Sequence, residues 1–253
     1  MLDRALGVLG ILTEKGPGMS LLEVSRALGL HKSTAHRLLM VLERHRLIEK
    51  NGEGRYRLGL KLFELGTRAV SQLDIRERAR PYLERVVMET GETAHLCVYD
   101  DGEVVYVDKV EPERSVRLAS SIGRRTPAYC TAVGKAIMAS LPAAEVERAV
   151  QRIGMRPLTR HTLTTLAELR NELTKVRRQG YAVDNEENEE GVRCVGAVVW
   201  GYTHEPLAAI SVSGPSFRVS NEKVPLLARS VTAAAEALSS ELGFRMAKRR
   251  AAR

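Results

Sequence analysis

The chain has 253 residues, of which 44% are hydrophobic but only 4% aromatic, and its formal net charge is +8. This length and composition favour two folded domains with aliphatic cores and exclude a disordered chain. The sequence shows neither an apolar run of the ~20 residues that a membrane span needs nor a secretory cleavage site, and its three cysteines are far apart, so we expect a cytoplasmic protein without a membrane partner.

The positive charge is concentrated at the two ends of the chain. Residues 1–65 hold eleven Lys or Arg against seven Asp or Glu, and residues 241–253 hold five bases and one acid, which gives +4 in each segment. The residues between them are neutral. A basic first quarter indicates a polyanionic partner for that segment, and the neutral body indicates a different role.

The first two helices are predicted by apolar spacing and by capping residues. Apolar side chains recur at three- and four-residue steps over residues 2–12, which is the pattern of one helical face. Ser20 followed by Glu23 is a capping box that begins a second helix at 21–27, and Gly29 can adopt the left-handed conformation that ends it. Two helices are therefore expected before residue 30.

A third helix, predicted at 32–46, has two contrasting faces. Its apolar stripe must pack on the first two helices. The stripe consists of Ala35, Leu38, Leu39 and Leu42. The opposite face carries side chains that can all donate a hydrogen bond, namely Lys32, Ser33, Thr34, His36, Arg37 and Arg44. A short helix, a Gly turn and a helix with a donor-rich N-terminal half form the helix-turn-helix arrangement, whose second helix fits the major groove of DNA.

A β-hairpin is predicted directly after this helix. Residues 47–49 and 56–58 flank a Gly-containing turn at 51–54, and such a hairpin is a wing that would hold Arg55 and Arg57 near the phosphate backbone. The alternative is a three-helix interaction module whose polar face is only solvated. The wing, the tight turn and the basic charge together favour DNA binding.

An amphipathic connector helix is predicted at 60–73. It has more apolar surface than a linker needs, and that surface packs either on a partner subunit or on its own domain. Helix is expected to continue from 75 to about 90, with a bend or a fresh start at Pro81, which lacks a hydrogen-bond donor.

Beyond residue 91 the pattern changes to alternating strands. Strands are predicted at 92–99, 103–109, 115–119, 181–183, 192–200 and 207–213. Helices are predicted at about 130–141, 143–153, 166–178 and 221–242. Three strands, three helices, three strands and a last helix indicate an α+β domain on a largely antiparallel sheet. We therefore expect a multidomain chain with a winged helix-turn-helix at 1–59, the connector at 60–73, the α+β domain at 74–243 and a disordered basic tail at 244–253.

Residues typical of enzymes are present in the second domain, but their spacing is wrong. The pair Gly134-Lys135 lacks the rest of a phosphate loop, and Ser211 and Ser213 lack the Gly-x-Ser-x-Gly elbow with an assignable His or acid. Cys194 stands alone in an apolar strand, where cysteine usually acts as a small buried residue. No histidines or cysteines have metal-ligand spacing. We predict no catalytic residue, metal or cofactor; turnover dependent on Cys194 or Ser213 is the alternative.

Six short blocks of residues, spread in order along nearly the whole chain, form a distinctive pattern. They are Leu30–Leu39, Arg55–Gly59, Ala79–Leu83, Thr131–Ala136, Gly180–Asp184 with Glu187 and Cys194, and Ser211–Pro215. Together they closely resemble the IclR-type bacterial transcriptional regulators. The resemblance implies a DNA-binding winged helix, a second domain like the GAF/PAS-type small-molecule sensors, and dimerisation through the connector region.

The resemblance also implies an effector cavity in the second domain. Its matching positions are Leu118, Thr126, Ala132, Val133, Asp184, Cys194, Ser211 and Ser213. The two serines are two apart on a strand and point the same way, so they either orient a small polar ligand or bond to neighbouring backbone. The run 126–135 leads into a helix whose free N–H groups can hold an anion, with Arg124 and Arg125 as counter-charges.

Two features depart from the family pattern. Five acids fall within the seven residues 184–190, and an ionised Asp184 beside a carboxylate ligand costs energy unless it is paired or protonated. The block 199–201 ends in Trp-Gly where the family usually has an aromatic residue and an Asp, so Trp200 either narrows the cavity or packs.

These observations predict a ligand-responsive transcription factor, either repressor or activator. A homodimer, or a dimer of dimers, would bind a roughly palindromic operator on double-stranded DNA, and a small-molecule effector, expected to be a small organic acid, would modulate that binding. Groove contacts are expected from Lys32, Ser33, Thr34, His36 and Arg37, and phosphate contacts from Arg55 and Arg57. The alternative is a constitutive architectural DNA-binding protein with an inert second domain.

Overall fold

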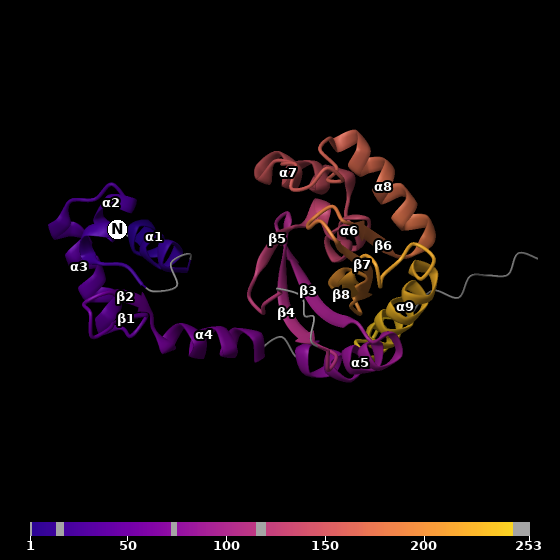
Figure 1. The fold of residues 1–253 in the computed structure, drawn as a ribbon, viewed down its shortest axis with the longest axis horizontal. Coiled ribbons are helices and arrows are strands. Elements are labelled where there is room, and N and C mark those ends of the chain that lie inside the picture. Colours follow the sequence, from indigo (N-terminus) through magenta and orange to yellow (C-terminus); the bar gives the residue numbers. More distant parts are fainter. Residues whose placement is uncertain (1, 14–17, 72–74, 115–119, 245–253) are drawn as a thin grey trace, which may run out of the picture. The chain divides into compact units, whose positions relative to one another are not determined.

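In the computed structural model the chain divides into two compact units, Met1–Asp74 and Ile75–Arg253 (Figure 1). The structure describes residues 2–13, 18–71, 75–114 and 120–244. The strand expected at 115–119 and almost all of the tail expected from residue 244 lie outside the described residues. Among the described residues, no helix is both long enough and apolar enough to cross a membrane.

The first unit is a winged helix followed by a connector. Its elements are α1 (Leu2–Thr13), α2 (Leu21–Ala27), α3 (Lys32–Arg44), β1 (Ile48–Lys50), β2 (Tyr56–Leu58) and α4 (Leu60–Ser71). The predicted capping box begins α2, since Ser20 N donates to Glu23 Oε2 at 2.7 Å and Glu23 N donates to Ser20 Oγ at 3.4 Å. Gly29 has the left-handed conformation expected of it, with φ at 61°. The sequence therefore predicts these local elements closely.

A third strand-like segment completes the wing, and the sequence did not predict it. Met19 pairs with Tyr56 in an isolated antiparallel bridge, with N···O distances of 2.7 and 2.9 Å. Gly18 precedes it with φ at 83°, and a Cβ there would lie 2.7 Å from the carbonyl oxygen of Tyr56. Only glycine fits both the backbone conformation and this close approach.

The core of the first unit forms where the α3 stripe meets the other elements. All four predicted stripe residues are buried, and Leu38, Leu39 and Leu42 pack with buried residues of α1, α2, the hairpin and the strand-like segment before α2. Those partners are Val8, Leu12, Met19, Val24, Ile48 and Tyr56. This burial fixes which face of α3 is turned outward.

The second unit is built on one six-stranded antiparallel sheet. Its strands are β3 (Thr93–Asp100), β4 (Glu103–Val110), β5 (Arg125–Pro127), β6 (Ala182–Asn185), β7 (Val192–Trp200) and β8 (Pro206–Pro215). They lie in the order β5-β4-β3-β8-β7-β6, and every neighbouring pair is antiparallel. The short strand β5 was not predicted, because three residues are too few for an alternation pattern.

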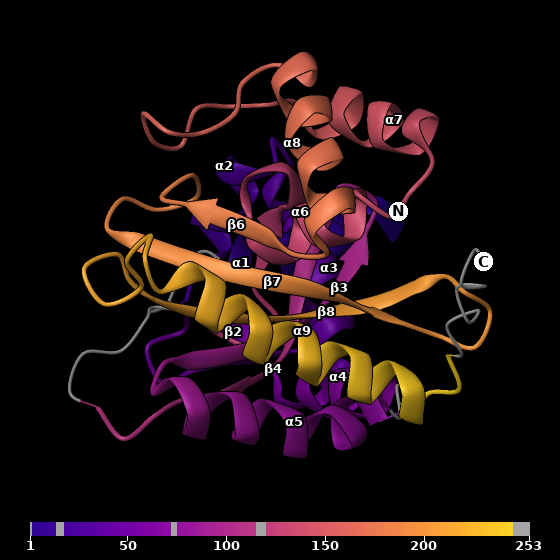
Figure 2. The same ribbon diagram turned by 90° about the vertical axis from the view of Figure 1, so that its right-hand side faces the viewer.

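Helices cover both faces of this sheet (Figure 2). They are α5 (Ile75–Thr90), α6 (Ala132–Met138), α7 (Ala143–Ile153), α8 (Leu166–Gln179) and α9 (Val224–Glu241), with a 3₁₀ turn η1 (Ala128–Cys130) before α6. One apolar core lies between the sheet and α5 with α9, and another lies between the sheet and α6, α7 and α8. The sheet is thus the central layer of an α+β domain, as expected.

Several predicted helix boundaries differ from the structure: α3 ends at Arg44 rather than at 46, and α6 covers Ala132–Met138 rather than about 130–141. Helix α5 runs through Pro81 without a fresh start. Helix α9 begins at Val224 rather than at 221, because residues 221–223 form a turn and Pro225 follows within the first helical positions.

Candidate functional site

The outward face of α3 carries the residues predicted to enter a DNA groove. Lys32, Ser33, His36 and Arg37 are exposed, and Thr34 is half-buried. Within the described part of the chain, none of the side chains of Lys32, Ser33, His36 or Arg37 makes a hydrogen bond or ion pair. A helix that buries its apolar stripe and leaves a row of donors without partners presents those donors to another molecule.

The same face also exposes two apolar side chains that the sequence analysis did not single out. Met40 is 55% exposed and Val41 is 47% exposed. Met40 lies one turn beyond Arg37 and His36 on the helix surface. An apolar side chain in this position is suited to contact the methyl group of thymine in the major groove. The sequence analysis missed both residues, because apolar residues on a helix are normally expected to lie in the core.

The two wing arginines have different surroundings. Arg55 donates from Nε and Nη2 to the carbonyl oxygen of Gly18 at 3.1 and 2.9 Å, and its Nη2 lies 2.8 Å from Glu23 Oε2. It therefore holds the wing against the start of α2, a role that sequence reasoning missed. Arg57 Nε lies 2.6 Å from Glu49 Oε1 on the paired strand, and both side chains are exposed. Arg57 is the wing arginine that lies more open to a phosphate.

In the second unit, strand register brings predicted residues together on the α6 side of the sheet. Asp184 pairs with Cys194, which pairs with Ser213, so these residues form a row across β6, β7 and β8. Gly196 and Ser211 belong to the next row. A Cβ on Gly196 would lie 2.9 Å from the carbonyl carbon of Ala132, so glycine lets α6 approach the sheet.

A small cavity of about 40 Å³ lies over these rows. Six of the eight predicted effector residues line it: Ala132, Val133, Asp184, Cys194, Ser211 and Ser213. Thr126 is buried on β5 and is not among the lining residues, and Leu118 lies outside the described residues. The cavity volume is well below the roughly 300–1,000 Å³ of typical ligand pockets, so a larger ligand must move side chains to enter.

Further polar residues of the cavity come from strands that the sequence analysis did not connect with it. His95 pairs with Ser211 across β3 and β8. Its Nε2 lies 2.8 Å from Ser120 Oγ, and its Nδ1 lies 3.4 Å from Ser213 Oγ. Tyr106 of β4 packs edge-on against the imidazole ring, with ring centroids 5.1 Å apart. No sequence motif marks these residues, because only the β3–β8 register places them here.

The pair of His95 and Ser213 does not make a convincing nucleophile and base. Burial, and to a lesser extent the charge of Lys109, lowers the pKa of His95 to about 3, so the imidazole is a weak base. The group on the other side of the ring is the hydroxyl of Ser120, where catalytic triads have a carboxylate. Burial also raises the pKa of Cys194, so its thiol stays protonated rather than nucleophilic.

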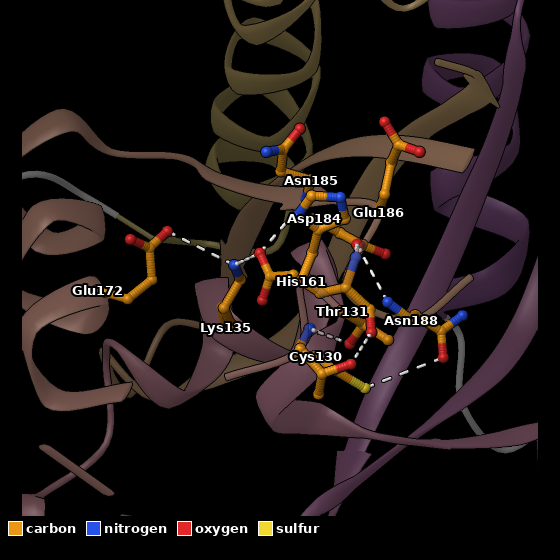
Figure 3. Close-up of polar contacts among 12 residues, drawn as sticks. Cys130, Thr131, Lys135, His161, Glu172, Asp184, Asn185, Glu186 and Asn188 are labelled. Atoms are coloured by element: carbon orange, nitrogen blue, oxygen red, sulfur yellow. Dashed lines mark hydrogen bonds and ion pairs between the residues drawn. The ribbon is translucent and has the colours of Figure 1, made fainter. Parts of the chain in front are cut away.

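The acid-rich loop after β6 is ordered by its own side chains (Figure 3). Asp184 Oδ1 accepts hydrogen bonds from Glu187 N at 2.8 Å and from Asn188 N at 3.3 Å. Glu187 is not among the lining residues of the cavity and pairs with Lys135 of α6 at 2.5 Å, while Lys135 also lies 3.5 Å from Glu172 of α8. Lys135, the lysine of the apparent phosphate loop, is fully buried in this ion-pair cluster.

The start of α6 differs from the anion site that the sequence predicted, in one of its N–H groups and in one of its two arginines. Helix α6 has only seven residues, and the hydroxyl of Thr131 already accepts from Gly134 N at 3.1 Å. Arg125 is paired with Glu103 and Asp100 at 2.8 and 2.6 Å, so its charge is used on the surface. Arg124 lines the cavity. The polar groups of the sheet therefore contribute more to the cavity than the helix terminus does.

A second and larger cavity, of about 800 Å³, lies between α6, α8, α9 and the end of β7. Trp200 stacks on Phe244 at its edge, with ring centroids 5.7 Å apart. Its walls include many alanines, and the hydroxyl of Ser239 is satisfied by Ala235 O and Trp200 N. Its lining is mainly apolar, and its one lining arginine, Arg177, already donates to Ala139 O at 2.6 Å, so it is a poorer candidate for specific recognition than the small polar cavity. The structure places Trp200 here rather than at the small polar cavity.

Comparison with known proteins identifies the family. The family model described as "Bacterial transcriptional regulator IclR C-terminal" matches residues 67–240, and the "IclR helix-turn-helix domain" matches residues 1–52. This chain belongs to the IclR family. It is therefore a DNA-binding transcriptional regulator with the helix-turn-helix and α+β domains described above.

Individual relatives cover almost the whole chain. The HTH-type transcriptional regulator XynR of Escherichia coli is 38% identical over 96% of both chains. The crystal structure of Thermotoga maritima IclR is 34% identical, with a TM-score of 0.77 over 96% of this chain and 98% of that one. An IclR homolog from Microbacterium hydrocarbonoxydans, solved in complex with 4-hydroxybenzoate, has a TM-score of 0.83 at 23% identity, over 95% and 98% of the two chains. It shows a shared fold.

Proposed function

We propose that this IclR-family regulator binds its operator through the exposed face of α3. A small organic acid that occupies the polar cavity of the second unit then lowers or raises the affinity for the operator. The observation that carries the proposal is the row of unpartnered donors on α3. Within the described chain, no hydrogen bond or ion pair engages the side chains of Lys32, Ser33, His36 and Arg37. Hydrogen-bond donors of this kind match the acceptors on base edges in the major groove.

The polar cavity supports the effector half of the proposal. It gathers hydroxyl, imidazole and carboxyl groups from strands that are far apart in the sequence, which is the arrangement of a specific small-molecule site. The homolog solved with 4-hydroxybenzoate illustrates that a protein of this fold can hold a small acid. Coupling between such a site and DNA typically amounts to ~1–3 kcal/mol.

Helix α4 supports assembly with a second copy of the chain. Its apolar side chains Leu60 and Phe63 are each 70% exposed, and Leu65 is 48% exposed. The sequence left open whether this surface packs on its own domain or on a partner. Such exposure within the described chain favours a partner, because exposed apolar patches commonly mark interfaces. A homodimer would place two α3 helices on two half-sites of a palindrome.

The decisive experiment is footprinting on genomic DNA fragments that the full-length protein itself enriches, with and without a library of small organic acids and sugar acids. The proposal expects protection of palindromic sequences that at least one acid changes. Weak sequence discrimination, together with no response to any compound, would instead support the constitutive architectural alternative. Turnover of a library compound that disappears in Ser213→Ala would support an enzyme.

A further inference from the structure

Asp184 is a buried carboxyl group in the wall of the polar cavity. It is only 2% exposed, and the two backbone hydrogen bonds that it accepts both end on Oδ1. Among the described residues, no ion pair joins it to a cation. A buried carboxylate without a cation is unfavourable, and a buried neutral carboxylic acid is not.

The charges behind Asp184 are already balanced against each other. Lys135 is the only buried ammonium group in this described cluster, and it faces Glu187 at 2.5 Å and Glu172 at 3.5 Å. Glu187 Oε2 is buried without a hydrogen-bond partner. Lys175 pairs with the other oxygen of Glu172 at 3.4 Å, so two ammonium groups and two carboxylates already balance before Asp184 is counted. If Asp184 were ionised, its charge would face that of Glu187, offset only by two backbone N–H groups and by Lys135, which is already paired with Glu187.

The remaining groups around Asp184 do not change this balance. Tyr106 of β4 and Cys194 of β7 stay neutral because burial raises their pKa values, and His95 of β3 stays neutral because burial lowers its pKa. Burial raises the pKa of Cys130 in η1 likewise. Burial first, and then the charge of Glu187, raises the pKa of Asp184 to about 7.

At the mouth of the cavity, Arg124 and Glu189 carry opposite charges. They allow a competing arrangement, in which Arg124 alone holds an effector carboxylate and Asp184 remains ionised. The two arrangements differ in one measurable property, since only a protonated Asp184 requires proton uptake.

We propose that Asp184 enters the effector complex as the neutral carboxylic acid and donates its proton in a hydrogen bond to a carboxylate of the effector. This inference rests on the proposed function and adds the charge state of the site to it. When Asp184 is ionised in the free protein, one proton passes from solvent to its carboxylate as the acid binds. The site then binds carboxylates more weakly as the pH rises above neutrality.

The first test needs no effector. Carboxyl carbons of aspartate are followed by NMR in the full-length protein labelled with ¹³C-aspartate, and the signal lost in Asp184→Asn is assigned to Asp184. We expect that signal to report a protonated carboxyl at pH 6 and to titrate near neutrality. Glu190→Gln is the matched control, because Glu190 is an exposed acid of the same loop outside the cavity lining. A carboxylate that stays ionised at pH 6 overturns the proposal.

The second test uses acetate and its neutral counterpart acetamide as probes, with binding measured by NMR shift changes of cavity residues between pH 6 and 8.5. Acetate, like the carboxyls of Asp and Glu, is ionised throughout this range. We expect its Kd to rise about tenfold per pH unit above neutrality, with no such change for acetamide or in Asp184→Asn.

Each other outcome of the acetate test is decisive as well. A pH-independent acetate Kd in the wild type indicates recognition by Arg124 and overturns the proposal. No acetate binding in either variant overturns acid recognition at Asp184. Neither result touches operator binding by α3, which footprinting measures separately, so failure of this inference and failure of the proposed function are distinguishable.

Discussion

The two units of this chain treat polar side chains in opposite ways. In the first unit, the candidate functional groups are exposed on one face of α3, and the buried residues behind them are almost all apolar. In the second unit, the candidate groups are buried, and hydroxyl, imidazole and carboxyl groups line one cavity beneath α6. An outward-facing site depends on the packing of one helix, whereas an enclosed site depends on every strand that contributes to it.

This contrast has an energetic side. Exposed donors on α3 cost little in the free protein, because water satisfies them. The buried polar groups of the second unit are shielded from water, so they must form hydrogen bonds and ion pairs with one another. The buried ion pair of Lys135 with Glu187 is an example. Substitutions in the second unit should therefore affect folding and ligand binding together more often than substitutions on α3 affect folding and DNA binding.

The largest expected effect is that of Gly134→Ala in the second unit. A Cβ at this position would overlap the carbonyl oxygen of Ala128, so η1 and α6 must separate. We expect the second unit to lose ~3 kcal/mol or more in urea unfolding, at or above the upper end of typical overpacking costs.

The matched control is Gly10→Ala in α1, where no atom lies within 4 Å of the added Cβ. It should stabilise the first unit by ~0.5–1 kcal/mol, since alanine favours a helix interior over glycine. If Gly134→Ala unfolds at the same urea concentration as the wild type, that result contradicts the close approach of α6 to η1 at this position.

Arg37→Ala tests the exposed site. If Arg37 contacts a base, operator affinity falls by ~1–3 kcal/mol in a gel-shift titration, while the unfolding curve stays unchanged. Arg229→Ala removes the same charge from the exposed side of α9 and should leave affinity nearly intact. Equal losses in both variants would indicate that only net charge matters, and unchanged affinity in Arg37→Ala would remove this residue from the interface.

Ser213→Ala tests the enclosed site. Loss of one hydrogen bond should weaken the effector response severalfold, about 1 kcal/mol, without changing operator affinity. Thr126→Val is the informative comparison, because the family resemblance assigns Thr126 to the cavity and the structure places it elsewhere. A loss of response in Thr126→Val as large as in Ser213→Ala would favour the resemblance over the geometry.

The smallest effect concerns acid stability of the first unit. The backbone of Ser20, then its hydroxyl, then Arg55 lower the pKa of Glu23 to about 2, below the ordinary value of 4.5. A lowered folded pKa means that this stabilisation is complete above pH 4.5 and disappears as the pH falls towards 2.

Because Glu23 is exposed, the loss should be small. Glu23→Gln should reduce the thermal midpoint slightly at pH 7 and flatten its decline between pH 4.5 and 2. Glu53→Gln, an exposed acid in the turn of the wing, serves as the control. A decline as steep in Glu23→Gln as in the wild type would contradict this assignment.

The sequence by itself determined the parts of the protein that depend on neighbours a few residues apart. The capping box at Ser20, the apolar stripe of α3 and the alternation that turns Ser211 and Ser213 to one side all follow from helical or strand periods. For this reason the outward face of α3 was predicted almost completely; only Met40 and Val41 were missed, because an apolar residue on a helix is expected to be buried.

Only the tertiary structure decided which distant residues share the enclosed site. His95 joins Ser211 through the β3–β8 register, Thr126 is kept out by its place on β5, and Arg55 is held by Glu23 across the first unit. Such contacts depend on which strands and helices become neighbours. That choice is made by burial summed over the whole domain, and no local pattern in the chain records it.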